Sequence, residues 1–383
     1  MKSNIKWLVN SVDLPFSCIS FFFNVGMKND SICGISHLIE HIVLEELKCQ
    51  NSNLFNKALI NAYVDKEFTC FHAILLHENM EEIINAFNNL FDFLDKGLSN
   101  EIVESQKNII YKIENERILS NPRLLNVLAL EEMALGDELK KTTLVDETFL
   151  SISEDEITDF CKEMYLSSLK YVVISGHFSD DNTEGFFYNK HQSLLLKQHE
   201  YKKGNRSRSI PISLNKINDI NDIRKIIAIT VDNLENITDY YALHIICLLY
   251  KVVINNLLKD TDFFIKDITF KLYLEKPIIF IAYNNFFDKT MSILKKIEVD
   301  RYNELFNNIK KHFLYGYLQK SCNLLDFNKE IYKVFYFYNE KLDFKNIVKF
   351  IDDVNFINIK KIHTKVVNGD YFFVPDGNMN EYI

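Results

Sequence analysis

Two histidines four positions apart, with a glutamate directly before the second, lie near the start of the chain in the segment GISHLIEHIVLEEL. On a helix, His37 and His41 lie one above the other on one face, so both imidazoles can bind one zinc ion at about 2.0 to 2.1 Å. Glu40 can then reach a zinc-activated water without being a ligand itself. It can take the proton of that water as hydroxide attacks a peptide carbonyl, and pass it on to the leaving amine.

A catalytic zinc site needs a third protein ligand, which is commonly a carboxylate. The best source is the helical segment QKNIIYKIENERILSNP, in which Glu114 has the apolar sequence neighbours Ile109, Ile110, Ile113 and Leu119. An unpaired carboxylate among buried apolar side chains is costly, and metal ligation removes that cost. Glu114 is therefore the predicted third ligand, and Glu104 and Glu116 are the alternatives. The competing interpretation of the whole motif is a pair of structural histidines on an apolar helix face.

The elements that must position these residues follow from the hydrophobic pattern. In the first half, the pattern predicts a strand at 17–25, a helix from about Gly34, strands at 61–64 and 67–75, a helix from Met80 and a helix at about 101–119. Ser153 and Glu156 have the spacing of a capping box at the start of another helix. The segment LKYVVIS at 169–175 is the predicted closing strand.

The second half of the chain repeats the early part of this order. A strand at 226–231 precedes a long helix from Thr238, and strands at 268–274 and 277–283 follow. Two copies of one α+β unit are the simplest explanation, each a mostly antiparallel sheet with helices packed on one face. The polar, basic stretch at 197–212 is the predicted linker between a first domain at 1–196 and a second at 213–383.

Composition limits the classes of function. The 383 residues are 47% hydrophobic with a net charge of −9, which is typical of a soluble globular protein and argues against a nucleic-acid partner. The apolar stretch at 241–258 contains His244 and Lys251, so it predicts a buried helix rather than a membrane span. The first thirty residues lack the features of a secretory signal, and the seven cysteines have no metal spacing. These features predict a cytoplasmic protein without a membrane partner.

The motif and its context resemble the pitrilysin/insulinase family of metallopeptidases, which includes the mitochondrial processing peptidases. His37-Leu-Ile-Glu40-His41, followed later by a Glu-x-Glu-Arg helix, looks like the inverted zinc motif of that family. Asn61-Ala62-x-x-x-x-Glu67-x-Thr69-x-Phe71 is similar to a second family segment. Gly136-Asp137, the capped helix and the strand ending at His177 extend the resemblance over residues 10 to 180.

The resemblance implies a fold, a cofactor and a substrate. The fold would be a pitrilysin-like half-clamshell of two similar domains with one Zn²⁺ site, formed by His37, His41 and Glu114 with Glu40 as the base. A peptide would lie extended against the strand containing Asn61 and Ala62 and add itself to the sheet by main-chain hydrogen bonds. Leader segments and small modified peptides are the expected substrates of such a zinc metalloendopeptidase.

Two departures from the family pattern matter for this expectation. The family usually has a second glutamate seven residues before the ligand glutamate, and that position here is Lys107. Family members that work alone share an Arg and a Tyr that hold the substrate backbone, and the segment 257–270 contains neither. A related second subunit is therefore expected to supply these contacts, with Lys259 or Lys266 as the alternative within the chain.

Two other functions compete with this interpretation. A non-catalytic scaffold or binding subunit would keep the fold and use the histidines structurally. A mitochondrial processing subunit would suit the family, but no Arg-rich, acid-poor presequence begins at Met1. Bound metal would distinguish an enzyme from a scaffold.

Overall fold

The chain forms two compact units, each of which contains a sheet and its helices. The computed structural model describes residues 5–76, 79–92, 94, 97–135, 144–166, 168–177, 226–273, 276–283 and 290–373. Unit 1 consists of Met1–Arg117, Lys141–Pro211 and Ser321–Lys333, and unit 2 consists of Ile118–Lys140, Ile212–Lys320 and Val334–Ile383. The linker predicted at 197–212 and the Gly136-Asp137 pair lie outside the described residues, so the domain boundary stays a prediction.

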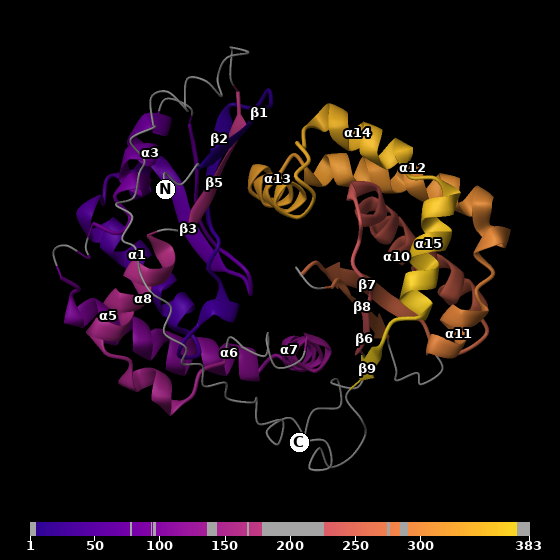
Figure 1. Cartoon of the computed structure of the whole chain (residues 1–383), viewed down its shortest axis with the longest axis horizontal. Coiled ribbons are helices and arrows are strands. Elements are labelled where there is room, and N and C mark those ends of the chain that lie inside the picture. Colours follow the sequence, from indigo (N-terminus) through magenta and orange to yellow (C-terminus); the bar gives the residue numbers. More distant parts are fainter. Residues whose placement is uncertain are drawn as a thin grey trace. The chain divides into compact units, whose positions relative to one another are not determined.

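Unit 1 has a five-stranded sheet in the order β1-β5-β2-β4-β3. Its strands are β1 (Lys6–Ser11), β2 (Phe16–Phe23), β3 (Ala58–Val64), β4 (Thr69–Leu76) and β5 (Leu169–Gly176). All neighbouring pairs are antiparallel except β1 with β5. Helices α1, α3, α5 and α8 lie together on one side of this sheet (Figure 1). The predicted α+β class with mostly antiparallel pairing is confirmed.

The helices of unit 1 agree closely with the sequence pattern. They are α1 (Ile35–Gln50), α2 (Leu54–Lys57), α3 (Met80–Asn88), α5 (Asn100–Asn108) and α8 (Glu154–Phe160), with π-helical turns at Ile109–Glu114 and Cys161–Tyr165 and 3₁₀ turns at Met27–Asn29 and Glu147–Ser151. Helix α6 (Asn115–Leu119) continues from the first π-helical turn into unit 2. The predicted capping box is present, because the Ser153 hydroxyl accepts from the Glu156 N–H and the Glu156 carboxylate accepts from the Ser153 N–H.

Strand β2 is buried on both faces, since a second layer covers the face opposite the helices. Side chains alternate along a strand, so Ile19 belongs to the helix-side core while Ser20 and Phe22 face the other way. Helix α13 (Leu324–Tyr338) packs there. The Asn328 amide donates to the Ser20 hydroxyl at 3.0 Å, and the ring of Tyr332 stacks on Phe22 with centroids 4.1 Å apart. The sequence predicts helices on one face of the sheet. Helix α13, which is far away in the sequence, covers part of the other face.

Unit 2 has a four-stranded antiparallel sheet in the order β7-β8-β6-β9. Its strands are β6 (Ile226–Thr230), β7 (Ile265–Lys271), β8 (Ile278–Tyr283) and β9 (Tyr371–Phe373). Its helices are α7 (Pro122–Leu135), α10 (Ile237–Leu257), α11 (Thr290–Lys296), α12 (Asn303–Lys320), α14 (Phe344–Asp353) and α15 (Phe356–Val367), with a 3₁₀ turn at Val299–Tyr302. Helices α10 and α15 lie on the same side of this sheet (Figure 1).

The two units repeat one topology, as the sequence predicts. Reading unit 2 as β9-β6-β8-β7 gives the same order as β5-β2-β4-β3 of unit 1. The same sequence offset separates the starts of α1 and α10, the capped starts of α8 and α15, and the starts of β5 and β9. Equivalent elements therefore pack equivalently, and α10 occupies the place in unit 2 that α1 occupies in unit 1.

Helix α10 is the one helix in the described ranges that is long and apolar enough to cross a membrane, and 72% of its apolar stretch is buried inside the protein. Its side chains face β7 and helices α12, α14 and α15. The prediction of a buried helix at 241–258 is confirmed.

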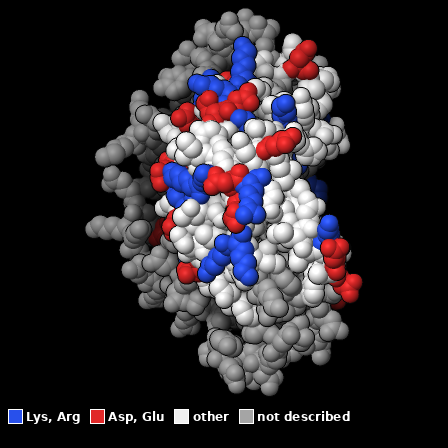
Figure 2. Space-filling view, turned by 90° about the vertical axis from the view of Figure 1, so that its right-hand side faces the viewer, with Lys and Arg blue, Asp and Glu red and all other residues white. Residues whose placement is uncertain are grey.

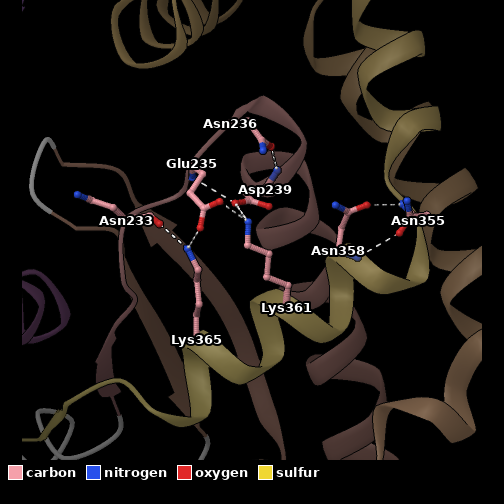
Figure 3. A network of polar contacts seen from close by, with 8 residues as sticks. All are labelled: Asn233, Glu235, Asn236, Asp239, Asn355, Asn358, Lys361 and Lys365. Atoms are coloured by element: carbon pink, nitrogen blue, oxygen red, sulfur yellow. Dashed lines mark hydrogen bonds and ion pairs between the residues drawn. The ribbon is translucent and has the colours of Figure 1, made fainter.

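An ion-pair network holds α15 against the start of α10 (Figure 3). The Lys361 ammonium lies 2.9 Å from the Asp239 carboxylate and 2.8 Å from that of Glu235. Asp239 is fully buried, whereas the Glu235 side chain is 64% exposed. Lys365, one turn later on α15, donates to the Asn233 carbonyl at 2.6 Å, and among the described carboxylates it pairs with the exposed Glu235.

We expect Lys361→Met to lower the free energy of unfolding by about 2–4 kcal/mol, because it leaves the buried Asp239 carboxylate without its counter-charge. Urea unfolding followed by circular dichroism measures this. The matched control is Lys365→Met on the same helix face, which leaves the Asp239 pair in place and should cost much less. Equal losses in the two variants would contradict a special role for the buried carboxylate.

Charges of both signs mix on the face of the protein seen in Figure 2, where blue and red side chains lie next to one another among neutral residues. Ion pairs of this kind in unit 2 include Lys360 with Asp300, and Arg301 with Glu298. Exposed ion pairs of this kind contribute little stability each.

Candidate metal centre

The histidine helix α1 begins at a sharply defined point. Gly34 has φ of 86°, and a Cβ there would lie 2.4 Å from a Val145 methyl group, so only glycine fits. The carboxylate of Asp30, which is 1% exposed, accepts from the Gly34 N–H at 3.0 Å and from the Ser36 N–H at 3.2 Å. These bonds satisfy donors that the first helical turn leaves open and fix the rotation of α1.

The rotation of α1 separates an apolar face from a polar one. Leu38, Ile39 and Ile42 are fully buried in the core of unit 1. The side chains of His37 and His41 remain 18% and 19% exposed. The predicted helix thus presents both histidines at the margin of the core, where they can reach an ion and its substrate.

Glu114 is the glutamate that the fold brings to this pair. One of its carboxylate oxygens lies 3.1 Å from Nε2 of His37, and the other lies 3.8 Å from Nε2 of His41. Glu104 instead bonds the Lys107 ammonium at 2.7 Å with its side chain 54% exposed, and Glu116 is exposed. Of the three candidate glutamates, the structure therefore supports Glu114.

Two of the distances between these donor atoms lie near the spacing that a zinc ion requires. Tetrahedral zinc with bonds of about 2.0 to 2.1 Å separates neighbouring donor atoms by about 3.3 Å. The two distances from Glu114 to the histidine nitrogens, 3.1 and 3.8 Å, bracket this value. Among the described residues, His37, Glu40 and His41 form a group that could hold a metal ion. Two imidazoles and a carboxylate are also the donor set of many catalytic zinc sites, so the residues fit this ion.

The apolar neighbours of Glu114 are only partly buried, so the prediction of a carboxylate among buried apolar side chains was wrong in part. Ile110 is buried, but Ile113 is 62% exposed and Leu119 is 36% exposed. The cause is the π-helical turn at Ile109–Glu114, which changes the rotation of every residue after it. Glu114 faces the histidines because of this turn, with its side chain 19% exposed.

Glu40 belongs to the same group of potential ligands as the two histidines, and its role as the base rather than a ligand stays a prediction. Its carboxylate is 3.8 Å from Nε2 of His37, and its side chain is 8% exposed. Burial raises the pKa of Glu40 to about 7, with the positive charge of His37 acting against the rise and the charge of Glu114 adding to it. A carboxylate with a pKa near neutrality is suited to accept and return a proton at that pH.

The ligand groups shift one another as well. Burial acts to lower the pKa of His37, but the hydrogen bond to Glu114 and the nearby carboxylates outweigh it and raise that pKa. Burial and the charge of His37 lower the pKa of His41. The hydrogen bond from His37 lowers the pKa of Glu114 and keeps it ionised. Perturbed, mutually coupled groups of this kind are typical of functional sites.

Gln106, which the sequence does not predict as a site residue, also contacts the histidine pair. Its amide oxygen lies 3.0 Å from Nδ1 of His41, on the side of the ring away from Nε2. The expected position, Lys107, is buried and donates to Glu104 and to the Leu150 carbonyl at 3.4 Å. No signal in the sequence marks the π-helical turn that brings Gln106 to His41, although the missing glutamate at Lys107 shows that something differs there.

Asn61 and Ala62 lie on β3, which is an edge strand of the unit 1 sheet and pairs only with β4 there. Helix α1 packs against β3, so the edge strand borders the histidine helix. Asn61 is exposed, and its side-chain oxygen accepts from the Ala62 N–H at 2.8 Å. An edge strand offers backbone groups to which an extended peptide can pair.

In unit 2, the equivalent helix α10 carries one histidine, His244. Its ring packs 4.4 Å from the ring of Phe270 and 5.3 Å from that of Phe313. Lys259 and Lys266, the alternative clamping residues, are both exposed. The described part of unit 2 contains no second cluster of metal ligands.

A family model matches the first part of the sequence. Residues 8–147 match the family model described as Insulinase (Peptidase family M16). A curated relative, the uncharacterized zinc protease YmxG of Bacillus subtilis (strain 168), is 23% identical over 186 residues. That match covers 45% of this chain and 44% of the relative, which is less than half of its length. The predicted resemblance to the insulinase family is confirmed for this part of the chain.

Two solved structures share the fold over nearly the whole chain. A chain of complex III2 from Candida albicans, bound to Inz-5, has a TM-score of 0.67 at 14% identity, covering 94% of this chain and 91% of that one. A protease from Helicobacter pylori has a TM-score of 0.68 at 12% identity, covering 97% of each chain. At such identities the likeness shows the fold alone.

Proposed function

We propose that this chain, which resembles insulinase-family peptidases over residues 8–147, is a zinc-dependent endopeptidase. The observation that carries the proposal is the convergence of His37, His41 and Glu114 from two helices, with Glu40 buried beside them. A zinc ion bound by these three side chains would act as a Lewis acid and activate water at neutral pH. The name of the Bacillus relative also contains the words zinc protease.

The residues of the chain perform the proton transfers of this proposal. The Glu40 carboxylate accepts a proton from the attacking water. The same carboxyl group then donates the proton to the amine that leaves when the peptide bond breaks. Glu114 stays ionised, so it remains available as a ligand throughout.

The proposed substrate is a peptide in an extended conformation. Pairing with the edge strand β3 would align such a peptide beside α1 through main-chain hydrogen bonds. Recognition of the main chain selects for extension and length rather than for particular side chains. Unfolded segments, leader peptides and small modified peptides are the substrate classes that meet this condition.

The proposed compartment is the cytoplasm. None of the seven cysteines forms a disulfide among the described residues, and five of them are buried. Unpaired thiols are typical of proteins that stay in a reducing compartment.

Metal analysis of the purified chain tests the enzyme against the scaffold alternative. The proposal expects about one zinc per chain after purification without chelators, as in catalytic sites with three protein ligands. It also expects hydrolysis of an unstructured peptide that chelation stops and added zinc restores. Absence of bound metal under these conditions would favour a non-catalytic subunit.

We expect the chain alone to hydrolyse peptides at least about 10²-fold more slowly than when mixed with a related second subunit. The reason is that β7 and the residues before it, 257–270, contain no Arg or Tyr to hold the substrate backbone, and misplacing a reacting group by about 1 Å can cost this much. Turnover of one unstructured peptide, measured with and without the product of a related gene that lacks the zinc motif, checks this. Full activity of the lone chain would instead point to Lys259 or Lys266 as the clamp.

A further inference from the structure

The side-chain amide of Gln106 faces the one ring nitrogen of His41 that is not directed toward Glu114. The amide oxygen is 3.0 Å from Nδ1, while Nε2 of the same ring is 3.8 Å from the Glu114 carboxylate. We propose that Gln106 is a positioning residue that holds His41 in the tautomer and orientation needed to bind metal. This inference rests on the proposed zinc site and adds a residue that the motif does not contain.

The tautomer of His41 decides whether it can be a ligand. A histidine that binds metal through Nε2 must keep the lone pair on that nitrogen, so the proton must be on Nδ1. An acceptor opposite Nδ1 stabilises this tautomer, and the Gln106 amide oxygen is such an acceptor. If the amide turned over and donated to Nδ1 instead, the proton would move to Nε2 and His41 could not bind the ion.

The two histidines differ in this respect. Nδ1 of His37 is buried and has no hydrogen-bond partner among the described residues. His37 is held by its contacts with Glu114 at 3.1 Å and Glu40 at 3.8 Å, both at Nε2. Among the described side chains, Gln106 is therefore the one that contacts Nδ1 of a proposed ligand histidine. We expect the affinity for metal to depend strongly on it.

Burial makes the Gln106 contact hard to replace with solvent. Gln106 is 8% exposed, and its neighbours on the inner face of the helix, Val103 and Ile110, are each 1% exposed. Because these neighbours are buried, the loss of the amide would remove the hydrogen-bond partner that the protein offers to Nδ1.

The π-helical turn explains why the residue is Gln106 and not Lys107. Seven residues span two turns of an α-helix, so position 107 would normally share a face with Glu114. The turn at Ile109–Glu114 adds one residue to this interval, since its hydrogen bonds close one residue later than those of an α-helix. Gln106 thereby reaches the face of Glu114, and Lys107 turns toward Glu104 and the Leu150 carbonyl.

We expect Gln106→Ala to weaken zinc binding about 10- to 100-fold, the usual cost of removing a hydrogen-bond partner of a metal-binding histidine. Gln106→Glu should bind zinc at least as tightly as the wild-type chain, because a carboxylate of similar size can accept from Nδ1 but cannot donate to it. Gln106→Met, which is similar in volume but cannot accept this bond strongly, should behave like the alanine variant. Competition with a chromophoric chelator measures the affinity of each variant.

Two further readouts separate positioning from a general effect on folding. Circular dichroism should show the same helix content in all variants, and ¹⁵N NMR should show His41 protonated at Nδ1 in the wild-type and Gln106→Glu chains. The matched control is Asn108→Ala on the same helix, since the exposed Asn108 amide bonds only the Glu104 carbonyl at 2.8 Å. That variant should bind zinc within about twofold of the wild type, as expected for a surface change that touches no ligand.

The outcomes distinguish this inference from the proposed function. If the wild type binds zinc and both Gln106→Ala and Gln106→Met bind it equally well, the positioning role is overturned while the zinc site stands. If the wild-type chain does not bind zinc, the proposed function is overturned and this inference with it. Weak binding in the alanine and methionine variants together with rescue in Gln106→Glu supports the inference.

Discussion

Replacing Glu40 by glutamine is expected to lower peptide hydrolysis by about 10²- to 10⁴-fold, the range typical for loss of a general base. Zinc content should stay at the wild-type level, because His37, His41 and Glu114 are unchanged. Glutamine keeps the size of the side chain and cannot accept the proton. Turnover of an unstructured peptide and metal analysis of the same samples measure both effects.

The control for this variant is Glu45→Gln, the same substitution further along α1. The Glu45 side chain is 35% exposed and pairs with Lys48 at 3.4 Å, so the control removes a surface charge alone. It should leave both activity and zinc content unchanged. If Glu40→Gln kept activity within about threefold of the wild type, the assignment of Glu40 as the base would be wrong.

The histidine pair could be predicted from the sequence because its geometry is local. Two residues four apart on a helix share a face whatever surrounds them, and α1 begins at Ile35, next to the predicted start at Gly34. The edge strand carrying Asn61 and the closing strand at 169–175 were also predicted, since strand periodicity and capping signals act over short distances.

Features that depend on distant contacts could not be predicted in this way. The cover over Ser20 and Phe22 comes from Asn328 and Tyr332, more than half of the chain away. Nothing near these residues in the sequence indicates which helix will pack there. The sequence of β2 has apolar residues on both faces of the strand. This pattern indicates only that the second face is buried, and does not identify the segment that covers it.

The candidate third ligand, Glu114, could be predicted only in part. Glu114 was predicted, but from neighbours that turned out to be partly exposed, and its rotation depends on the π-helical turn before it. A π-helical turn has no reliable sequence signal, because its cost is offset by the packing and the ligands that it positions. Because of the same turn, the sequence does not indicate that Gln106 lies near the site. Its role is inferred from its 3.0 Å contact with His41.

Glu114→Ala is expected to lose zinc and, with it, peptide hydrolysis, because two imidazoles alone do not form a three-ligand catalytic site. The matched controls are Glu104→Ala and Glu116→Ala, which remove exposed carboxylates from the same helical segment. Both controls should keep about one zinc per chain, as the unchanged three-ligand site requires. Metal analysis after gel filtration without chelators compares the three variants. If Glu114→Ala kept zinc and one of the controls lost it, that control residue would be the third ligand. The proposal that the π-helical turn positions Glu114 as a ligand would then be wrong.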